Sequence, residues 1–192
     1  MTHFRKIQRP EKNEYPNYSQ YYFDLIHTND DILKLLHDNF FKIKDFIYSL
    51  PEDKLTYRYD IDKWTIKEIL VHNIDDERIY SYRAMRYARN DSTPLMAFEQ
   101  DDYVKYSNAN ERTLENIFEE YWCVRDSTLK LFQNLPEEAL IRTGKNRNPD
   151  NSIDNERSVR ALAYHITGHE LRHIKIIKER YLNMQTDDKC II

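Results

Sequence analysis

Apolar residues recur at the three- and four-residue spacing of an α-helix in four long segments of this chain. The first segment starts near Asn29–Asp30 and is closed by Pro51, which cannot continue a helix. The second starts after Thr65, which forms with Glu68 the capping-box pattern of a helix start. The four segments cover about residues 29–51, 65–90, 108–135 and 156–181. Four amphipathic helices of this length predict an all-α fold, an up-down four-helix bundle.

The segments outside these helices are polar and rich in turn-forming residues. We expect residues 1–28, which are rich in tyrosine, to form an irregular arm, and residues 182–192 to form a polar tail. Two longer connecting loops are expected at 91–107 and 140–155. A chain of 192 residues is long enough to bury a core, so we expect one bundle domain over 1–192.

Composition and charge narrow the classes of function. The chain has only two glycines, which favours helices over a turn-rich β protein. Its net charge is −4 and its basic residues are scattered, so neither the charge nor its distribution indicates a nucleic-acid partner. No apolar run approaches the roughly 18 residues of a membrane span. Cys123 and Cys190 form no CxxC pair, so we expect reduced thiols in a cytoplasmic protein.

Histidines occupy inward positions on two of the predicted helices. His169 and His173 continue the apolar stripe of the fourth helix, whereas His165 lies beside that stripe. His72 lies in the corresponding stripe of the second helix. Residues four apart lie about 6 Å apart along a helix, so two such imidazoles can share one ion at about 2.0–2.1 Å. We therefore predict a divalent-metal site formed by His72, His169 and His173.

The predicted site has three nitrogen ligands and one open position, as catalytic zinc sites do. Imidazole also binds other divalent metals, so we expect Zn or Ni first, with Fe and Mn as further candidates. Glu68 and Asp76 lie four residues on either side of His72 and are expected to hydrogen-bond its second ring nitrogen. The alternative is that these histidines are ordinary polar or core residues of the bundle.

Two further charged residues are candidates for binding substrate or supporting the site. Arg83 continues the stripe of His72 and could hold an anionic substrate group, with an ion pair at the bundle end as the alternative. Glu170 either supports a neighbouring ligand or faces solvent. The segment from His169 to His173 also matches HExxH, in which Glu170 would be the general base of a metalloprotease. No strand pattern offers an edge for an extended peptide, which disfavours a protease, and no catalytic residue is assigned.

The stretches that contain these histidines resemble a known family. KWTIKEILVHNIDDERIYSYRAMRYARND resembles the second-helix motif of DinB/YfiT-like proteins, and SVRALAYHITGHELRHIKIIKERYL resembles their last helix. The resemblance covers nearly the whole chain. It implies an up-down four-helix bundle, commonly dimeric, that binds a divalent metal through His72, His169 and His173. Members of this family include thiol transferases that use low-molecular-weight bacterial thiols, isomerases and proteins without known activity.

These observations lead to two functional hypotheses. The first is a metal-dependent enzyme of the thiol-transferase or hydrolase type that acts on a small molecule, with a low-molecular-weight thiol as a candidate substrate. Its substrate would enter at one bundle end, under the 91–107 and 140–155 loops. The second is a non-catalytic metal-binding or structural bundle. Under both hypotheses we expect a homodimer and neither a nucleic-acid nor a membrane partner.

Overall fold

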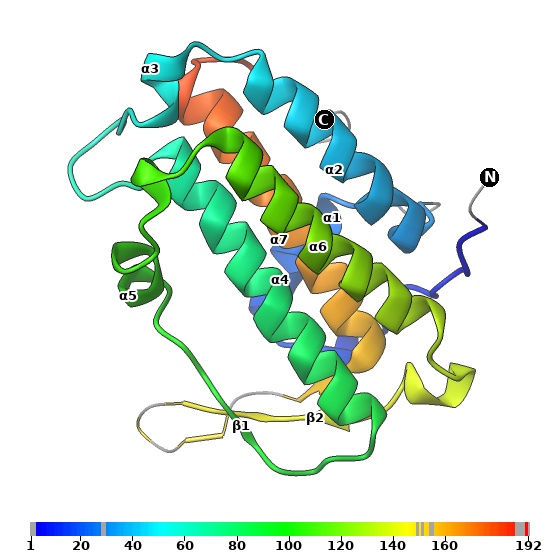
Figure 1. Cartoon of the computed structure of the whole chain (residues 1–192). Coiled ribbons are helices and arrows are strands. Elements are labelled where there is room, and N and C mark those ends of the chain that lie inside the picture. Colours follow the sequence, from blue (N-terminus) through cyan, green and yellow to red (C-terminus); the bar gives the residue numbers. More distant parts are fainter. Residues whose placement is uncertain are drawn as a thin grey trace.

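A computed structural model of the chain describes residues 3–27, 30–148, 150, 152–153, 156–186 and 191. Its four long helices form a bundle (Figure 1). They are α2 (Ile32–Tyr48), α4 (Ile66–Ala88), α6 (Leu114–Gln133) and α7 (Val159–Ile176). Both α2 and α4 pack against α6 and α7, so α2 and α4 occupy diagonal corners although they are consecutive long helices. The predicted four-helix bundle is therefore confirmed.

The helices of this bundle do not simply alternate in direction. Thr65, the N-cap of α4, donates a 2.7 Å hydrogen bond to Asn110, which lies just before α6, so α4 and α6 begin at the same end. The 89–113 connection returns along the bundle, and α6 runs parallel to α4 (Figure 1). This corrects the strict up-down order. The 23 residues of α4 span about 35 Å, a distance that a connection of this length covers easily.

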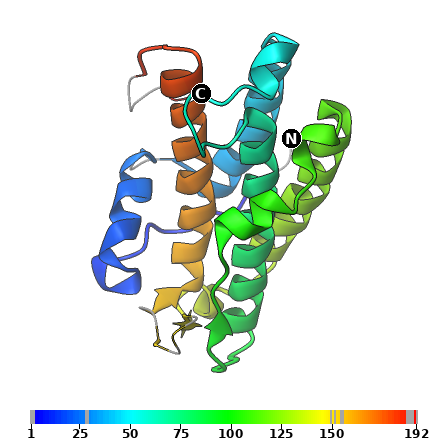
Figure 2. The same ribbon diagram turned by 90° about the vertical axis from the view of Figure 1, so that its left-hand side faces the viewer.

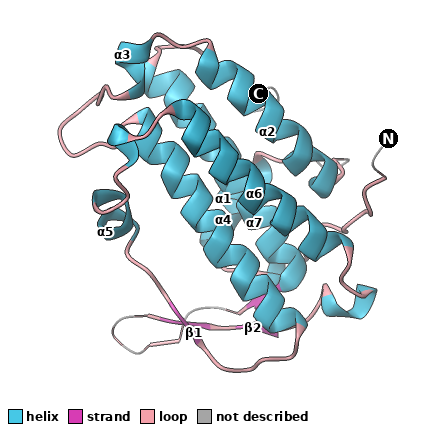
Figure 3. Cartoon of the chain, in the orientation of Figure 1, coloured by secondary structure: helices cyan, strands magenta, loops and turns pink. Residues whose placement is uncertain are grey.

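Short elements complete the fold (Figure 3). Two-residue strands pair β1 with β3 in parallel and β2 with β4 antiparallel, at the end where α4 finishes and α7 begins. The short helices are α1 (Gln20–Asp24), α3 (Glu52–Leu55) and α5 (Gln100–Lys105), and the strands are β1 (Leu95–Met96), β2 (Thr143–Gly144), β3 (Asn146–Arg147) and β4 (Arg157–Ser158). Single 3₁₀ turns cover Lys12–Glu14, Asn17–Ser19, Ala109–Glu111 and Glu137–Ala139, and α7 continues as a π-helical turn, Ile177–Tyr181.

Side-chain caps set the starts of the long helices. Thr65 and Glu68 form the predicted capping box of α4. Helix α6 begins later than predicted, because Asn108 adopts a left-handed conformation with φ 54° and a 3₁₀ turn follows it. Helix α7 also begins later than predicted, since residues 157–158 form a strand and Ser158 then accepts a hydrogen bond from the backbone N–H of Ala161 at 3.1 Å.

The N-terminal arm packs along α7, on the side away from α6 (Figure 2). Phe23 and Ile26 of this arm are buried in the core. Gly168 permits this packing, because a Cβ atom there would lie 2.3 Å from the backbone oxygen of Tyr22. The described part of the predicted irregular arm, residues 3–27, is thus an ordered layer over α7. In the predicted polar tail, residues 187–190 and 192 lie outside the described residues, and Ile191 is buried.

The apolar faces of the four long helices form one core. Among the described residues, no helix is long and apolar enough to cross a membrane.

Candidate metal centre

Three imidazoles from two helices meet inside the bundle, near the start of α4 and the end of α7. The Nε2 atom of His169 lies 3.2 Å from Nε2 of His72 and 3.2 Å from Nε2 of His173. One ring nitrogen from each residue lies within 4.8 Å of the other two. Two ligands about 2.0–2.1 Å from a tetrahedral ion are about 3.3 Å apart, so this spacing fits one shared cation. The structure thus brings together the three residues predicted from the sequence.

Hydrogen bonding alone does not explain this arrangement. A ring nitrogen has one in-plane position, which holds either a proton or a lone pair. Nε2 of His169 can therefore make only one of its two 3.2 Å contacts as a hydrogen bond. A cation between the three rings would accept all three lone pairs at once.

Burial keeps these rings in the neutral form. It lowers the pKa of His72 from 6.5 to about 4, with the nearby His169 as the second cause. Burial likewise lowers the pKa of His169 and holds that of His173 well below its ordinary value. Neutral imidazole is the form that binds a metal. The three nitrogens are therefore available as ligands at neutral pH.

Asp76 lies against His169 rather than His72. Its Oδ2 atom is 3.4 Å from Nδ1 of His169 and 3.7 Å from Nε2 of His165. Burial acts to raise the pKa of this carboxyl, but the neighbouring histidines, His169 first, outweigh burial and hold it below its usual value. A carboxylate at Nδ1 keeps the proton there and leaves the Nε2 lone pair for a metal.

This placement corrects the predicted contact between Asp76 and His72. Residues four apart on one helix point in similar directions, so both side chains reach across to α7 instead of meeting each other. Nδ1 of His72 is buried and has no hydrogen-bond partner among the described residues.

Glu68 caps a helix instead of supporting His72. Its carboxylate accepts hydrogen bonds from the backbone N–H of Thr65 at 2.7 Å, from Arg58 at 2.7 Å and from Asn110 at 2.9 Å. The predicted role of Glu68 beside His72 is therefore wrong. The capping-box pattern in the same stretch of sequence indicates its actual role.

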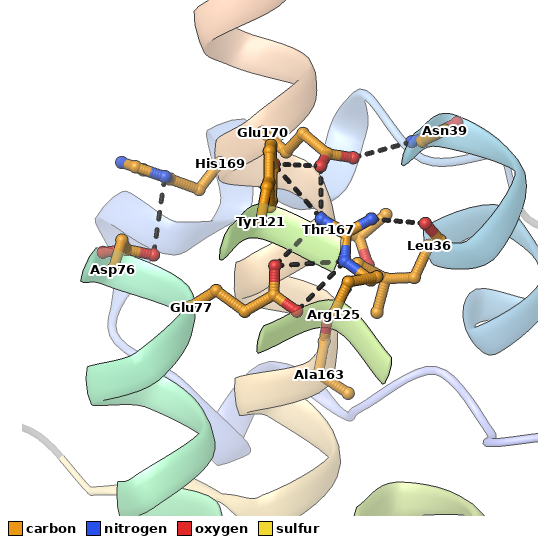
Figure 4. A network of polar contacts seen from close by, with 10 residues as sticks. All are labelled: Leu36, Asn39, Asp76, Glu77, Tyr121, Arg125, Ala163, Thr167, His169 and Glu170. Carbon is orange, nitrogen blue, oxygen red and sulfur yellow. Dashed lines mark hydrogen bonds and ion pairs between the residues drawn. The ribbon is translucent and has the colours of Figure 1, made fainter. Parts of the chain in front are cut away.

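Glu170 leaves α7 on the side opposite His169 (Figure 4). It pairs with the fully buried Arg125 and accepts a hydrogen bond from Tyr121. Arg125 also binds Glu77, with contacts of 2.9–3.1 Å. Glu170 thus neither faces solvent nor touches the histidine cluster, which corrects both expectations. In this position it cannot serve as the general base of an HExxH protease.

Arg83 lies too far along α4 to reach substrate at the histidine cluster. It is eleven residues beyond His72, which is about 16 Å along the helix axis. Its Nη2 atom donates to the backbone oxygen of Met96 at 3.1 Å, and its guanidinium lies over the ring of Tyr80. Within the described part of the chain it has no carboxylate partner, so the predicted ion pair is not found either.

A pocket of about 250 Å³ opens onto His173. Aromatic, apolar and charged side chains wall it: Tyr59, Asp62, Lys63, Trp64, Ile69, Asp101, Ile176 and Tyr181. The ring of Trp64 lies 4.6 Å from that of His72 and stacks at 6.1 Å with that of His173. Neither Trp64 nor Asp101 was predicted as a site residue, although Trp64 lies in the stretch that resembles the second-helix motif of the DinB/YfiT-like proteins.

Of the two loops predicted to cover the substrate entrance, only one contributes a described residue to the lining of this pocket. Asp101 of α5 places the later part of the 91–107 segment at the pocket, as expected, whereas β1 of the same segment lies at the other bundle end. The described pocket-lining residues include none from 140–155. Strands β2 and β3 of that segment lie instead at the opposite bundle end, beside the start of α7 (Figure 1).

Comparison with known proteins identifies the family of this chain. Residues 42–177 match the family model of the DinB superfamily. The chain belongs to the DinB superfamily. The predicted family is thus confirmed, and the matched range includes the three clustered histidines.

Two relatives of this DinB superfamily protein carry the name "Putative metal-dependent hydrolase". The one from Oceanobacillus iheyensis is 27% identical over 137 residues, which are 70% of this chain and 76% of the relative. The one from Halalkalibacterium halodurans is 28% identical over 135 residues, which are 66% of this chain and 72% of the relative.

A solved structure shares the fold. YfiT from Bacillus subtilis, described as "a probable metal-dependent hydrolase with an unusual four-helix bundle topology", aligns with a TM-score of 0.66 at 12% identity. The alignment covers 92% of this chain and 94% of YfiT. At this identity the similarity establishes the bundle fold alone.

Proposed function

We propose that this protein is a metal-dependent enzyme, a hydrolase or a thiol transferase, that acts on a small molecule at the three-histidine cluster. The observation that carries this proposal is the convergence of three neutral imidazoles, with Nε2 contacts of 3.2 Å, beside an open pocket. The donor set suits Zn or Ni first and Fe or Mn after them. The names of the two relatives support metal-dependent hydrolysis.

Each side chain of the site has a distinct task in this proposal. A divalent cation held by His72, His169 and His173 would supply Lewis acidity and lower the pKa of a water or thiol nucleophile. Asp76 fixes the ring of His169 so that its lone pair faces the ion. The indole of Trp64 lies against the ring of His72 and would keep water from that side of the cluster.

The size of the pocket supports a small substrate. Its volume of about 250 Å³ is close to the lower end, about 300 Å³, of typical small-molecule sites. A thiol nucleophile and an electrophile would both have to fit beside Trp64 and Asp101, which line the pocket. The more specific form of this proposal is that the enzyme transfers a low-molecular-weight thiol to the electrophile.

Removal and return of the metal test this proposal. Protein stripped with a chelator is reloaded with Zn²⁺, Ni²⁺, Mn²⁺ or Fe²⁺ and assayed for hydrolysis of activated esters and for conjugation of thiols to a chlorinated electrophile. We expect turnover that returns with metal, is lost in His173→Ala and persists in the control His3→Ala, since His3 is exposed on the arm. If metal only raises the melting temperature and no substrate turns over, the protein is the non-catalytic bundle.

A further inference from the structure

A fourth histidine lies directly behind the cluster. His165 is buried on α7, one turn before His169, and their rings are nearly parallel with centroids 5.5 Å apart. Its Nε2 atom is 3.7 Å from Oδ2 of Asp76, the same oxygen that lies 3.4 Å from Nδ1 of His169. One carboxylate oxygen is therefore shared by two imidazoles, of which only His169 belongs to the proposed metal site.

Two tyrosines from different helices fix the ring of His165. Tyr80 of α4 stacks on it face to face, with centroids 3.8 Å apart and planes 6° apart. Tyr22 of α1 meets it edge-on at 5.1 Å and also meets the ring of His169 at 5.6 Å. The stack with Tyr80 fixes the plane of the His165 ring, and within that plane Nε2 faces Oδ2 of Asp76.

The charge of Asp76 selects the tautomer of His165. An ionised carboxylate only accepts hydrogen bonds, so the favourable neutral form of His165 carries its proton on Nε2, facing Asp76. Burial lowers the pKa of His165, which keeps the ring neutral. Among the described residues, the ionic partners of Asp76 are His165 and His169. Without His165, this buried carboxylate would retain one of these two partners and could turn away from Nδ1 of His169.

We propose that His165 is a positioning residue of the metal centre, whose N–H holds the Asp76 carboxylate against Nδ1 of His169 and so directs the His169 lone pair toward the metal. The inference rests on the proposed metal site. His165 itself binds no metal: its ring lies behind that of His169, and it is absent from the set of converging ligand atoms.

The affinity for Zn²⁺ tests this role without any substrate. His165→Phe keeps a flat ring against Tyr80 but removes the N–H group. We expect unchanged stoichiometry and about 10–100-fold weaker Zn²⁺ binding in competition with a chromophoric chelator. His165→Gln, whose amide N–H can reach the position of Nε2, should recover most of the affinity. Tyr164→Phe is the matched control, because it removes one polar atom at the neighbouring buried position of α7 and should bind Zn²⁺ like the wild type.

A double-mutant cycle separates positioning from a merely structural effect. If His165 acts through Asp76, then adding His165→Phe to Asp76→Asn should weaken Zn²⁺ binding no further. Additive losses, or wild-type affinity in His165→Phe, would overturn the inference. Thermal melts of the metal-free variants show whether each is folded, and His165→Leu, which also lacks the N–H group, serves in the cycle if His165→Phe is not. Absence of Zn²⁺ binding in the wild type would instead refute the metal site itself.

Discussion

Arg125 joins the four long helices through buried charge. Its side chain lies on α6 and is fully buried. It pairs with Glu77 of α4 and Glu170 of α7 and donates to the backbone oxygen of Leu36 on α2 (Figure 4). One guanidinium thus contacts every other long helix of the bundle. Replacing it measures how strongly this network stabilises the fold.

The expected loss follows from the two carboxylates that Arg125→Met leaves behind. Methionine fills much of the arginine stem, so the main change is two buried carboxyl groups without their cation. Removing one partner of a buried ion pair costs about 3–5 kcal/mol. Burial, the largest cause, raises the pKa of Glu77, so this group can take up a proton and limit the loss. We therefore expect the free energy of unfolding to fall by about 3–4 kcal/mol, a large part of the typical total of about 5–15 kcal/mol.

Urea unfolding at pH 7 with excess chelator measures this loss without a contribution from metal. Arg78→Met is the control, because Arg78 is 47% exposed and its ion pairs with Asp75 and Glu120 lie at the surface. It should cost less than about 1 kcal/mol. The triple variant with Glu77→Leu and Glu170→Leu should recover most of the stability lost in Arg125→Met, since no buried charge is left unpaired. A loss below about 1 kcal/mol in Arg125→Met would refute the reasoning.

Three further predictions concern local features. Gly168→Ala gains about 1 kcal/mol of helix propensity, but its Cβ would lie 2.3 Å from the backbone oxygen of Tyr22. We therefore expect a lower melting temperature and faster proteolysis of the N-terminal arm. A higher melting temperature would contradict this. The pKa of His72 is about 4 in the folded state and 6.5 in the unfolded state, so the unfolded state binds more protons as pH falls. The metal-free protein should therefore lose up to about 3 kcal/mol between pH 6.5 and 4 relative to a His72→Asn variant, and equal urea midpoints for the two across this range would exclude the effect. Thr65→Ala removes the cap that pairs with Glu68 and should cost about 1 kcal/mol in urea unfolding, whereas unchanged stability would show that the cap contributes nothing.

The sequence predicts the long helices well because their signals are local. Apolar periodicity locates all four, and the pattern of Thr65 and Glu68 fixes the start of α4. The direction of α6 has no local signal, because it depends on the path of the 89–113 connection. The start of α7 was placed too early since residues 157–158 pair with β2, a contact between segments far apart in the chain.

The same distinction explains what could be predicted of the candidate site. His169 and His173 share one helix, so their spacing alone indicates a ligand pair. The packing of α4 against α7 decides which carboxylate contacts which ring. Asp76 therefore faces His169 on α7 and not His72, its neighbour on α4. The surroundings of Glu170 come from other helices, so the HExxH pattern carries no information about them.

X-ray absorption spectroscopy of the protein loaded with one equivalent of Zn²⁺ tests the central claim most directly. We predict three imidazole nitrogens at about 2.0–2.1 Å from the zinc, falling to two in His169→Ala. A shell with fewer than three imidazoles in the wild type, or a sulfur ligand from a cysteine, would contradict the three-histidine centre.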